Sequence, residues 1–161
     1  MTSQEQQIIS QYKQTAPIDI TAMATSLGLS VYETYDLPNG ISGKICRDVG
    51  DSSSGYSISV NADEPYTRRR FTIAHECAHF VLHRAKIGDE LSDDAMYRSE
   101  KLNSKEEFEA NNLAAELLMP RILVHQYVRQ GISSPSELAE TFEVSVPAMK
   151  VRMRYLYQEA Y

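Results

Sequence analysis

The motif H-E-C-A-H at residues 75–79 constrains this chain more than any other feature of its sequence. It lies within residues 65–84, where apolar residues recur at the spacing of one helix face, so we expect a helix there. Residues four apart on a helix share a face, about 6 Å apart along the axis, so His75 and His79 can bind one metal ion. Glu76 is displaced from that face and can take a proton from a metal-bound water. This pattern is typical of zinc peptidases.

A catalytic zinc needs three protein ligands and one open position, so a third ligand has to be found. His83 lies on the same stripe, but it is about 12 Å from His75 along the helix axis, too far to share the ion. We expect it to cap the helix or to pack near its end. The third ligand is therefore expected from another helix, predicted from about Ser104 to just before Pro120.

Two acids of that second helix are candidates for the third ligand. Glu107 starts a helix-spaced series of mostly small or apolar residues that can pack closely against the motif helix: Glu107, Ala110, Asn111, Ala114 and Leu118. Glu109 belongs to the opposite, polar face and is held in reserve. We expect Asn111 to hydrogen-bond a ligating side chain. A competing interpretation makes Glu107 part of a capping box that folds back on Ser104.

The rest of the chain predicts an α+β fold. Two short helices are expected before Gly28, followed by three short strands at residues 29–35, 41–46 and 56–60. We interpret these strands as a small antiparallel sheet packed on a helical zinc-peptidase core. The polar run at residues 88–103 is expected to be a loop that can act as a rim or lid.

The C-terminal end predicts further helices with a helix-turn-helix cadence. We expect a metallopeptidase domain at residues 1–131 and a helical segment at residues 132–161 that packs on the same core. Its last helix carries three basic residues, Lys150, Arg152 and Arg154. The simpler interpretation is a packing unit. The rival hypothesis is a regulator that binds DNA or a partner protein through these helices, with a structural or sensing zinc.

Composition argues against several classes of protein. The formal net charge of -6 disfavours general nucleic-acid binding, because phosphate neutralisation calls for a basic surface. No apolar run approaches the roughly 20 residues that a membrane span needs, and the N-terminal stretch is too polar for a signal peptide. Two cysteines are too few for a disulfide framework. We therefore expect a cytoplasmic protein without a membrane partner.

Two stretches of this chain, RRRFTIAHECAHFVLH at residues 68–83 and EFEANNLAAELLMP at residues 107–120, resemble the ImmA/IrrE family of zinc metallopeptidases. The resemblance extends over most of the chain, beginning near Pro17. It implies a compact α+β fold with a helical zinc site. The Glu-x-x-x-Asn spacing at residues 107–111 is also similar to the Glu-x-x-x-Asp of other zinc peptidases, which makes the chain gluzincin-like.

The same resemblance implies roles for individual residues and a substrate class. It places zinc ligation on His75, His79 and an acid of residues 107–111, and catalysis on Glu76. Members of the family typically cleave a helix-turn-helix repressor encoded nearby, often that of a prophage or mobile element. We therefore expect a zinc endopeptidase that relieves repression by cutting such a protein.

Overall fold

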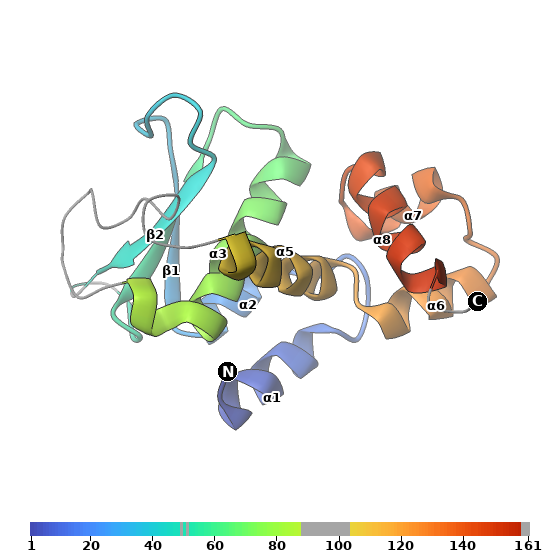
Figure 1. The fold of residues 1–161 in the computed structure, drawn as a ribbon, viewed down its shortest axis with the longest axis horizontal. Coiled ribbons are helices and arrows are strands. Elements are labelled where there is room, and N and C mark those ends of the chain that lie inside the picture. The colour runs from blue at the N-terminus through green and yellow to red at the C-terminus, as the bar shows by residue number, and fades with distance from the viewer. Residues whose placement is uncertain (49, 51, 88–103, 159–161) are drawn as a thin grey trace.

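The computed structural model describes residues 1–48, 50, 52–87 and 104–158. The elements follow one another as α1 (Ser3–Tyr12), α2 (Ile20–Ser26), β1 (Leu29–Thr34), β2 (Gly43–Arg47), β3 (Tyr56–Asn61), α3 (Tyr66–Ile87), α5 (Ser104–Leu118), α6 (Arg121–Arg129), α7 (Pro135–Phe142) and α8 (Val146–Gln158). This arrangement is α+β, as predicted (Figure 1). The expected loop at residues 88–103 lies outside the described residues. None of the described helices combines the length and apolar character needed to cross a membrane.

The sheet is mixed, so the expectation of an antiparallel sheet is wrong. Its strand order is β1-β3-β2, in which β3 pairs with β1 in parallel and with β2 antiparallel. The burial of the strands fits this order, because four of the six residues of the central strand β3 are buried, whereas the edge strand β1 has only one buried residue. The backbone N–H and C=O groups of a buried strand need hydrogen-bond partners, and those of β3 pair with β1 on one edge and with β2 on the other. The alternation within β3 predicts a strand, but it does not reveal this order.

Helix α3 lies between the sheet and α5, and it contacts β2 and β3 as well as α5 (Figure 1). Gly43 at the start of β2 makes the approach to the sheet possible. A Cβ atom at this position would lie 2.4 Å from Cγ2 of Thr72 and 2.9 Å from the carbonyl oxygen of Ser59. Because Thr72 comes one helical turn before the motif, any side chain at position 43 would displace the helix that carries His75 from the sheet.

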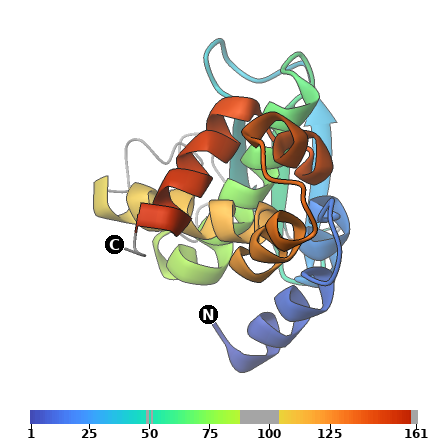
Figure 2. The ribbon, with the colours of Figure 1, turned by 90° about the vertical axis from the view of Figure 1, so that its right-hand side faces the viewer.

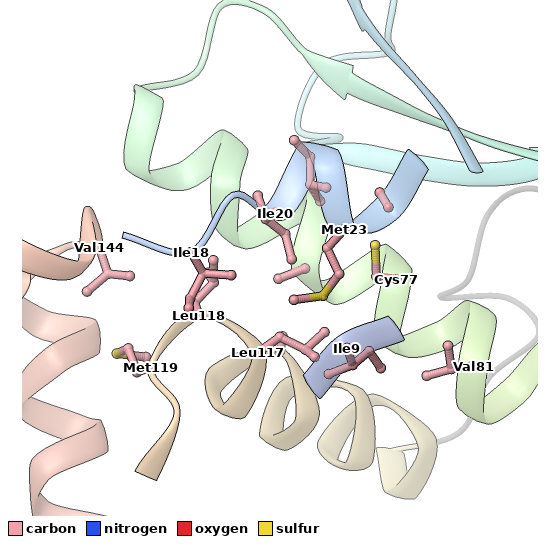
Figure 3. Close-up of a cluster of buried hydrophobic side chains, with 14 of the residues drawn as sticks. Ile9, Ile18, Ile20, Met23, Cys77, Val81, Leu117, Leu118, Met119 and Val144 are labelled. Carbon is pink, nitrogen blue, oxygen red and sulfur yellow. The ribbon is translucent and has the colours of Figure 1, made fainter. Parts of the chain in front are cut away.

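One cluster of buried apolar side chains joins these elements. In Figure 3, the cluster includes Ile9 from α1, Met23 from α2, Cys77 from α3 and Leu117 from α5. Burial raises the pKa of the Cys77 thiol, so this side chain stays protonated and packs as a small hydrophobe. Cys77 therefore belongs to the core and supplies no ligand to the motif in which it stands.

The C-terminal helices α6, α7 and α8 follow the end of α5, and Figure 2 views the molecule from their side. Leu138 and Met149 from these helices belong to the same buried cluster as the core around α3. Arg70 of α3 also donates hydrogen bonds to the carbonyl oxygens of Glu143, at 3.0 Å, and Phe142, at 3.3 Å. These contacts tie the turn between α7 and α8 to the motif helix.

Arg152 of α8 provides a second tie, and its loss should destabilise the fold. Its side chain is buried, its Nε donates to the carbonyl oxygen of Met119 at 3.0 Å, and its guanidinium pairs with Glu116. We expect Arg152→Ala to lower the free energy of unfolding by about 2 kcal/mol, because the Met119 carbonyl loses its side-chain donor and the Glu116 carboxylate loses its buried cation. The exposed Arg154 on the same helix is the matched control. Arg154→Ala should change the free energy of unfolding by less than about 0.5 kcal/mol. Equal effects in urea unfolding would contradict this prediction.

Candidate metal centre

The two histidines of the motif meet through their ring nitrogens. Nε2 of His75 and Nε2 of His79 lie 3.0 Å apart, as expected for residues four apart on one helix. His79 is fully buried and His75 nearly so. The ring of Phe71, one turn earlier in α3, stacks on His75 with 6.4 Å between the centroids. Burial and stacking therefore hold both imidazoles with Nε2 directed at one point.

Helix α5 brings Glu107 to the same point. Its Oε2 lies 3.2 Å from Nε2 of His75, and its Oε1 lies 3.1 Å from Nε2 of His79. Ala110 and Ala114, on the same face of α5, are fully buried, and their small side chains allow α5 to pack closely on α3. Both oxygens of Glu107 face the histidines, which disfavours the capping-box interpretation.

These three side chains form a candidate metal site. Their ligand atoms all lie within 4.8 Å of one another, close enough for one ion to contact each of them. Two imidazole nitrogens and one carboxylate oxygen suit a catalytic zinc, which takes three protein ligands at about 2.0–2.2 Å and keeps one position open. Metal ligation by these residues stays a prediction, with a donor set that fits it.

Glu76 follows His75 directly in α3, and its side chain is fully buried. Burying a carboxylate is costly, so a buried carboxylate next in sequence to a candidate metal ligand is a candidate functional residue. Its place is the one that the motif gives to the general base. Its role in catalysis stays a prediction.

A second line of contacts runs behind His79. Nδ1 of His79 lies 3.0 Å from Nδ1 of His83, and Nε2 of His83 lies 2.9 Å from Oε2 of Glu109. The hydrogen bond with His83 lowers the pKa of Glu109, because it favours the ionised carboxylate. The helix departs from α geometry at His83, with φ of -126° and ψ of 24°. His83 thus contacts a histidine of the candidate metal site.

The sequence alone did not predict this second line. The sequence predicts Glu109 on the polar face, but its side chain contacts His83, whereas Asn111 is exposed and has no hydrogen bond to the candidate ligands in the described structure. The feature of the sequence that points to this contact is the four-residue separation of His79 and His83, which repeats the spacing of His75 and His79. The spacing alone does not predict that His83 contacts His79, because the departure of the backbone from α-helical geometry at His83 cannot be inferred from the sequence.

A pocket of about 180 Å³ opens one helical turn before His75. Both α3 and the segment from the end of α7 to α8 line it, through Thr67, Arg68, Phe71, Val144, Ser145 and Ala148. Phe71 is shared between this pocket and the ring stack on His75. The C-terminal helices therefore form one wall of a pocket that adjoins the candidate metal site.

Comparison with known proteins gives a family match and a structural likeness. The model of the Peptidase_M78 family, described as the IrrE N-terminal-like domain, matches residues 19–154. A solved structure of a Mycobacterium tuberculosis transcriptional regulator is similar, with a TM-score of 0.62 and 17% sequence identity. The likeness covers 96% of this chain and 47% of that one, so this chain spans about half its length. The curated proteins that were compared include no match.

Proposed function

The chain belongs to the Peptidase_M78 family of IrrE N-terminal-like domains, and from this premise we propose that it is a zinc-dependent endopeptidase. The observation that carries the proposal is the convergence of His75, His79 and Glu107 on one point. In this proposal they are the metal ligands, and Glu76 is the catalytic residue. A family of peptidases and a donor set suited to zinc support the same reaction class, hydrolysis of a peptide bond.

Zinc, when bound, polarises the scissile carbonyl and lowers the pKa of a coordinated water. The protein's own contribution is to orient the reacting groups. His75 and His79 are held by burial on α3, and Glu107 reaches them from α5, so the packing of two helices sets the spacing of the ligands. The carboxylate of Glu76 accepts the proton of the attacking water and returns it to the departing amine nitrogen.

The pocket next to His75 is a suitable place for part of a polypeptide substrate. Phe71, Val144 and Ala148 give it an apolar lining, and Arg68 adds a cation. In this proposal residues 132–161 belong to the same folding unit as residues 1–131. The buried cluster common to both supports this, because an independent module would have its own core.

The substrate class in this proposal is a helix-turn-helix transcriptional repressor of a prophage or mobile element, and its cleavage relieves repression. The support is the resemblance of residues 68–83 and 107–120 to the ImmA/IrrE family. The similar mycobacterial structure is that of a transcriptional regulator, and its likeness concerns the fold. In this setting the expected location of the enzyme is the cytoplasm, and its partner is a protein.

The test is incubation of the purified, zinc-loaded protein with the repressor encoded beside its gene. We expect the repressor to be cut at defined positions, as judged by mass spectrometry of the fragments. Cutting should stop when a chelator removes the metal and resume when zinc is returned. Zinc binding without any cleavage of that repressor would contradict the proposal and favour a regulator with a structural or sensing zinc.

The rival DNA-binding hypothesis receives little support from α8. Of its three basic side chains, Arg152 is buried against Glu116 and Met119, which leaves Lys150 and Arg154 exposed. Two exposed cations on one helix make a small phosphate footprint, and each phosphate contact contributes separately to the affinity. Direct DNA binding through these helices is therefore not favoured.

A further inference from the structure

We propose that His83 and Glu109 form an outer hydrogen-bond chain that fixes the ring of His79 for metal binding. This inference rests on the zinc site of the proposed function, and it assigns two residues that the reaction itself does not use. His83 and Glu109 are positioning residues in this proposal, since neither belongs to the cluster of candidate ligands.

The direction of each hydrogen bond follows from what His79 has to do. To offer a lone pair on Nε2 to a metal, a neutral His79 must carry its proton on Nδ1. That proton points to Nδ1 of His83, 3.0 Å away, which accepts it. The proton of His83 is then on Nε2, 2.9 Å from Oε2 of Glu109. One tautomer of each histidine satisfies both contacts, and the chain ends on a carboxylate.

The backbone supports the same assignment. The helix leaves α geometry at His83, where the chain turns beside the histidine cluster, and the His83 side chain remains buried. Buried imidazole nitrogens need hydrogen-bond partners, and the contacts to His79 and Glu109 supply both. Helix α5 thus provides two carboxylates two residues apart, Glu107 at the candidate metal site and Glu109 at the end of the chain.

A chain of this kind acts on the metal through its ligand. It fixes the tautomer and the ring orientation of His79 and makes Nε2 a better electron donor. Loss of such outer partners typically weakens metal binding by about 10- to 100-fold. His79 should therefore depend on His83 for its affinity for zinc.

The experiment measures the zinc dissociation constant of the full chain by competition with a chromophoric chelator. We expect His83→Ala to weaken zinc binding by about 10- to 100-fold, and Glu109→Ala to weaken it by a smaller but measurable factor of up to about 10-fold. The double variant should bind zinc no more weakly than His83→Ala alone, because the loss of His83 already breaks the hydrogen-bond chain between His79 and Glu109. Additive losses would overturn the proposal, since they would show that the two residues act separately.

A conservative variant separates positioning from general structural support. In His83→Asn, the amide oxygen can take the place of Nδ1 and accept the proton of His79, so most of the zinc affinity should return. In that background Glu109→Ala should have no further effect, because the amide does not extend to Glu109. A zinc affinity of His83→Asn no higher than that of His83→Ala would contradict the proposed hydrogen-bond chain.

Arg84 provides a control at the same end of α3. It pairs with Glu5 and lies over the ring of Phe80, with 3.9 Å between its Cζ and the ring centroid. Arg84→Ala should lower the melting temperature of the metal-free protein and leave its zinc affinity unchanged. If Arg84→Ala loses as much zinc affinity as His83→Ala, the proposal is overturned. Such a result would show that any disturbance at the end of α3 weakens zinc binding.

The possible outcomes separate this inference from the proposed function. If the wild-type protein binds zinc and His83→Ala binds it equally well, the proposed hydrogen-bond chain is overturned and the metallopeptidase proposal stands. If the wild-type protein binds no zinc, both fail together. Should His83→Ala not fold, the partly exposed Glu109 carries the test, and an unchanged zinc affinity in Glu109→Ala overturns the chain.

Discussion

Glu76→Gln should leave zinc binding intact and lower kcat/KM for the true substrate by about 10²- to 10⁴-fold, the usual contribution of a general base. The amide has nearly the same shape as the carboxylate, but it cannot accept the proton of the attacking water. Metal analysis and a cleavage time course measure the two properties on the same sample. The loss of cleavage without the loss of zinc is the signature expected of Glu76.

The matched control for this variant is Glu140→Gln on α7, which removes a charge of the same kind from an exposed position. It should cleave at the wild-type rate. Cleavage by Glu76→Gln at the wild-type rate would show that the proton is taken by another group, and the mechanism would be wrong.

Glu107→Ala should have the largest effect on metal binding. Glu107 is the carboxylate that contacts Nε2 of both His75 and His79, so its removal takes away one of the three proposed ligands. We expect zinc affinity to fall by more than about 100-fold, beyond the range for outer contacts. The measurement is the zinc content of the dialysed protein.

Glu109→Ala is the comparison built into the same helix. It should retain one zinc per chain after the same dialysis, with a zinc affinity that is measurably weaker than in the wild-type protein, but by no more than about 10-fold. If Glu109→Ala loses the metal and Glu107→Ala keeps it, the third ligand is Glu109.

The parts of the site that depend on local geometry could be predicted from the sequence. The spacing of His75 and His79 brings them onto one face because α-helix geometry is nearly constant over one turn. The same argument directs Glu107, Ala110 and Ala114 to one side of α5, where the structure has both alanines buried. In each case the relevant distance lies within a single helix.

The parts that depend on how elements meet could not be predicted. The alternating pattern at Tyr56–Asn61 locates a strand, but its central place between β1 and β2 follows from burial in the whole fold. The contact of His83 with His79 depends on a break in helical geometry at a single residue. That of Glu109 with His83 depends on the distance between two helices. These are tertiary properties, which periodicity does not encode.

The family match shows how far along the chain the resemblance extends. It covers residues 19–154 and confirms the resemblance inferred from two short stretches around the motif and α5. The match continues beyond Gly131 into α7 and α8, the helical segment that the sequence predicts to pack on the same core. Arg70 and the pocket beside Phe71 give a physical reason for that continuity, since both join the C-terminal helices to α3.

The central claim is that this chain holds a zinc ion between α3 and α5, and the most direct test is the zinc stoichiometry of the purified full chain. Elemental analysis after dialysis against metal-free buffer should give one zinc per chain in the wild-type protein and in Glu76→Gln. Glu107→Ala should give almost none. A wild-type protein that neither retains zinc nor takes it up when zinc is supplied would contradict the claim.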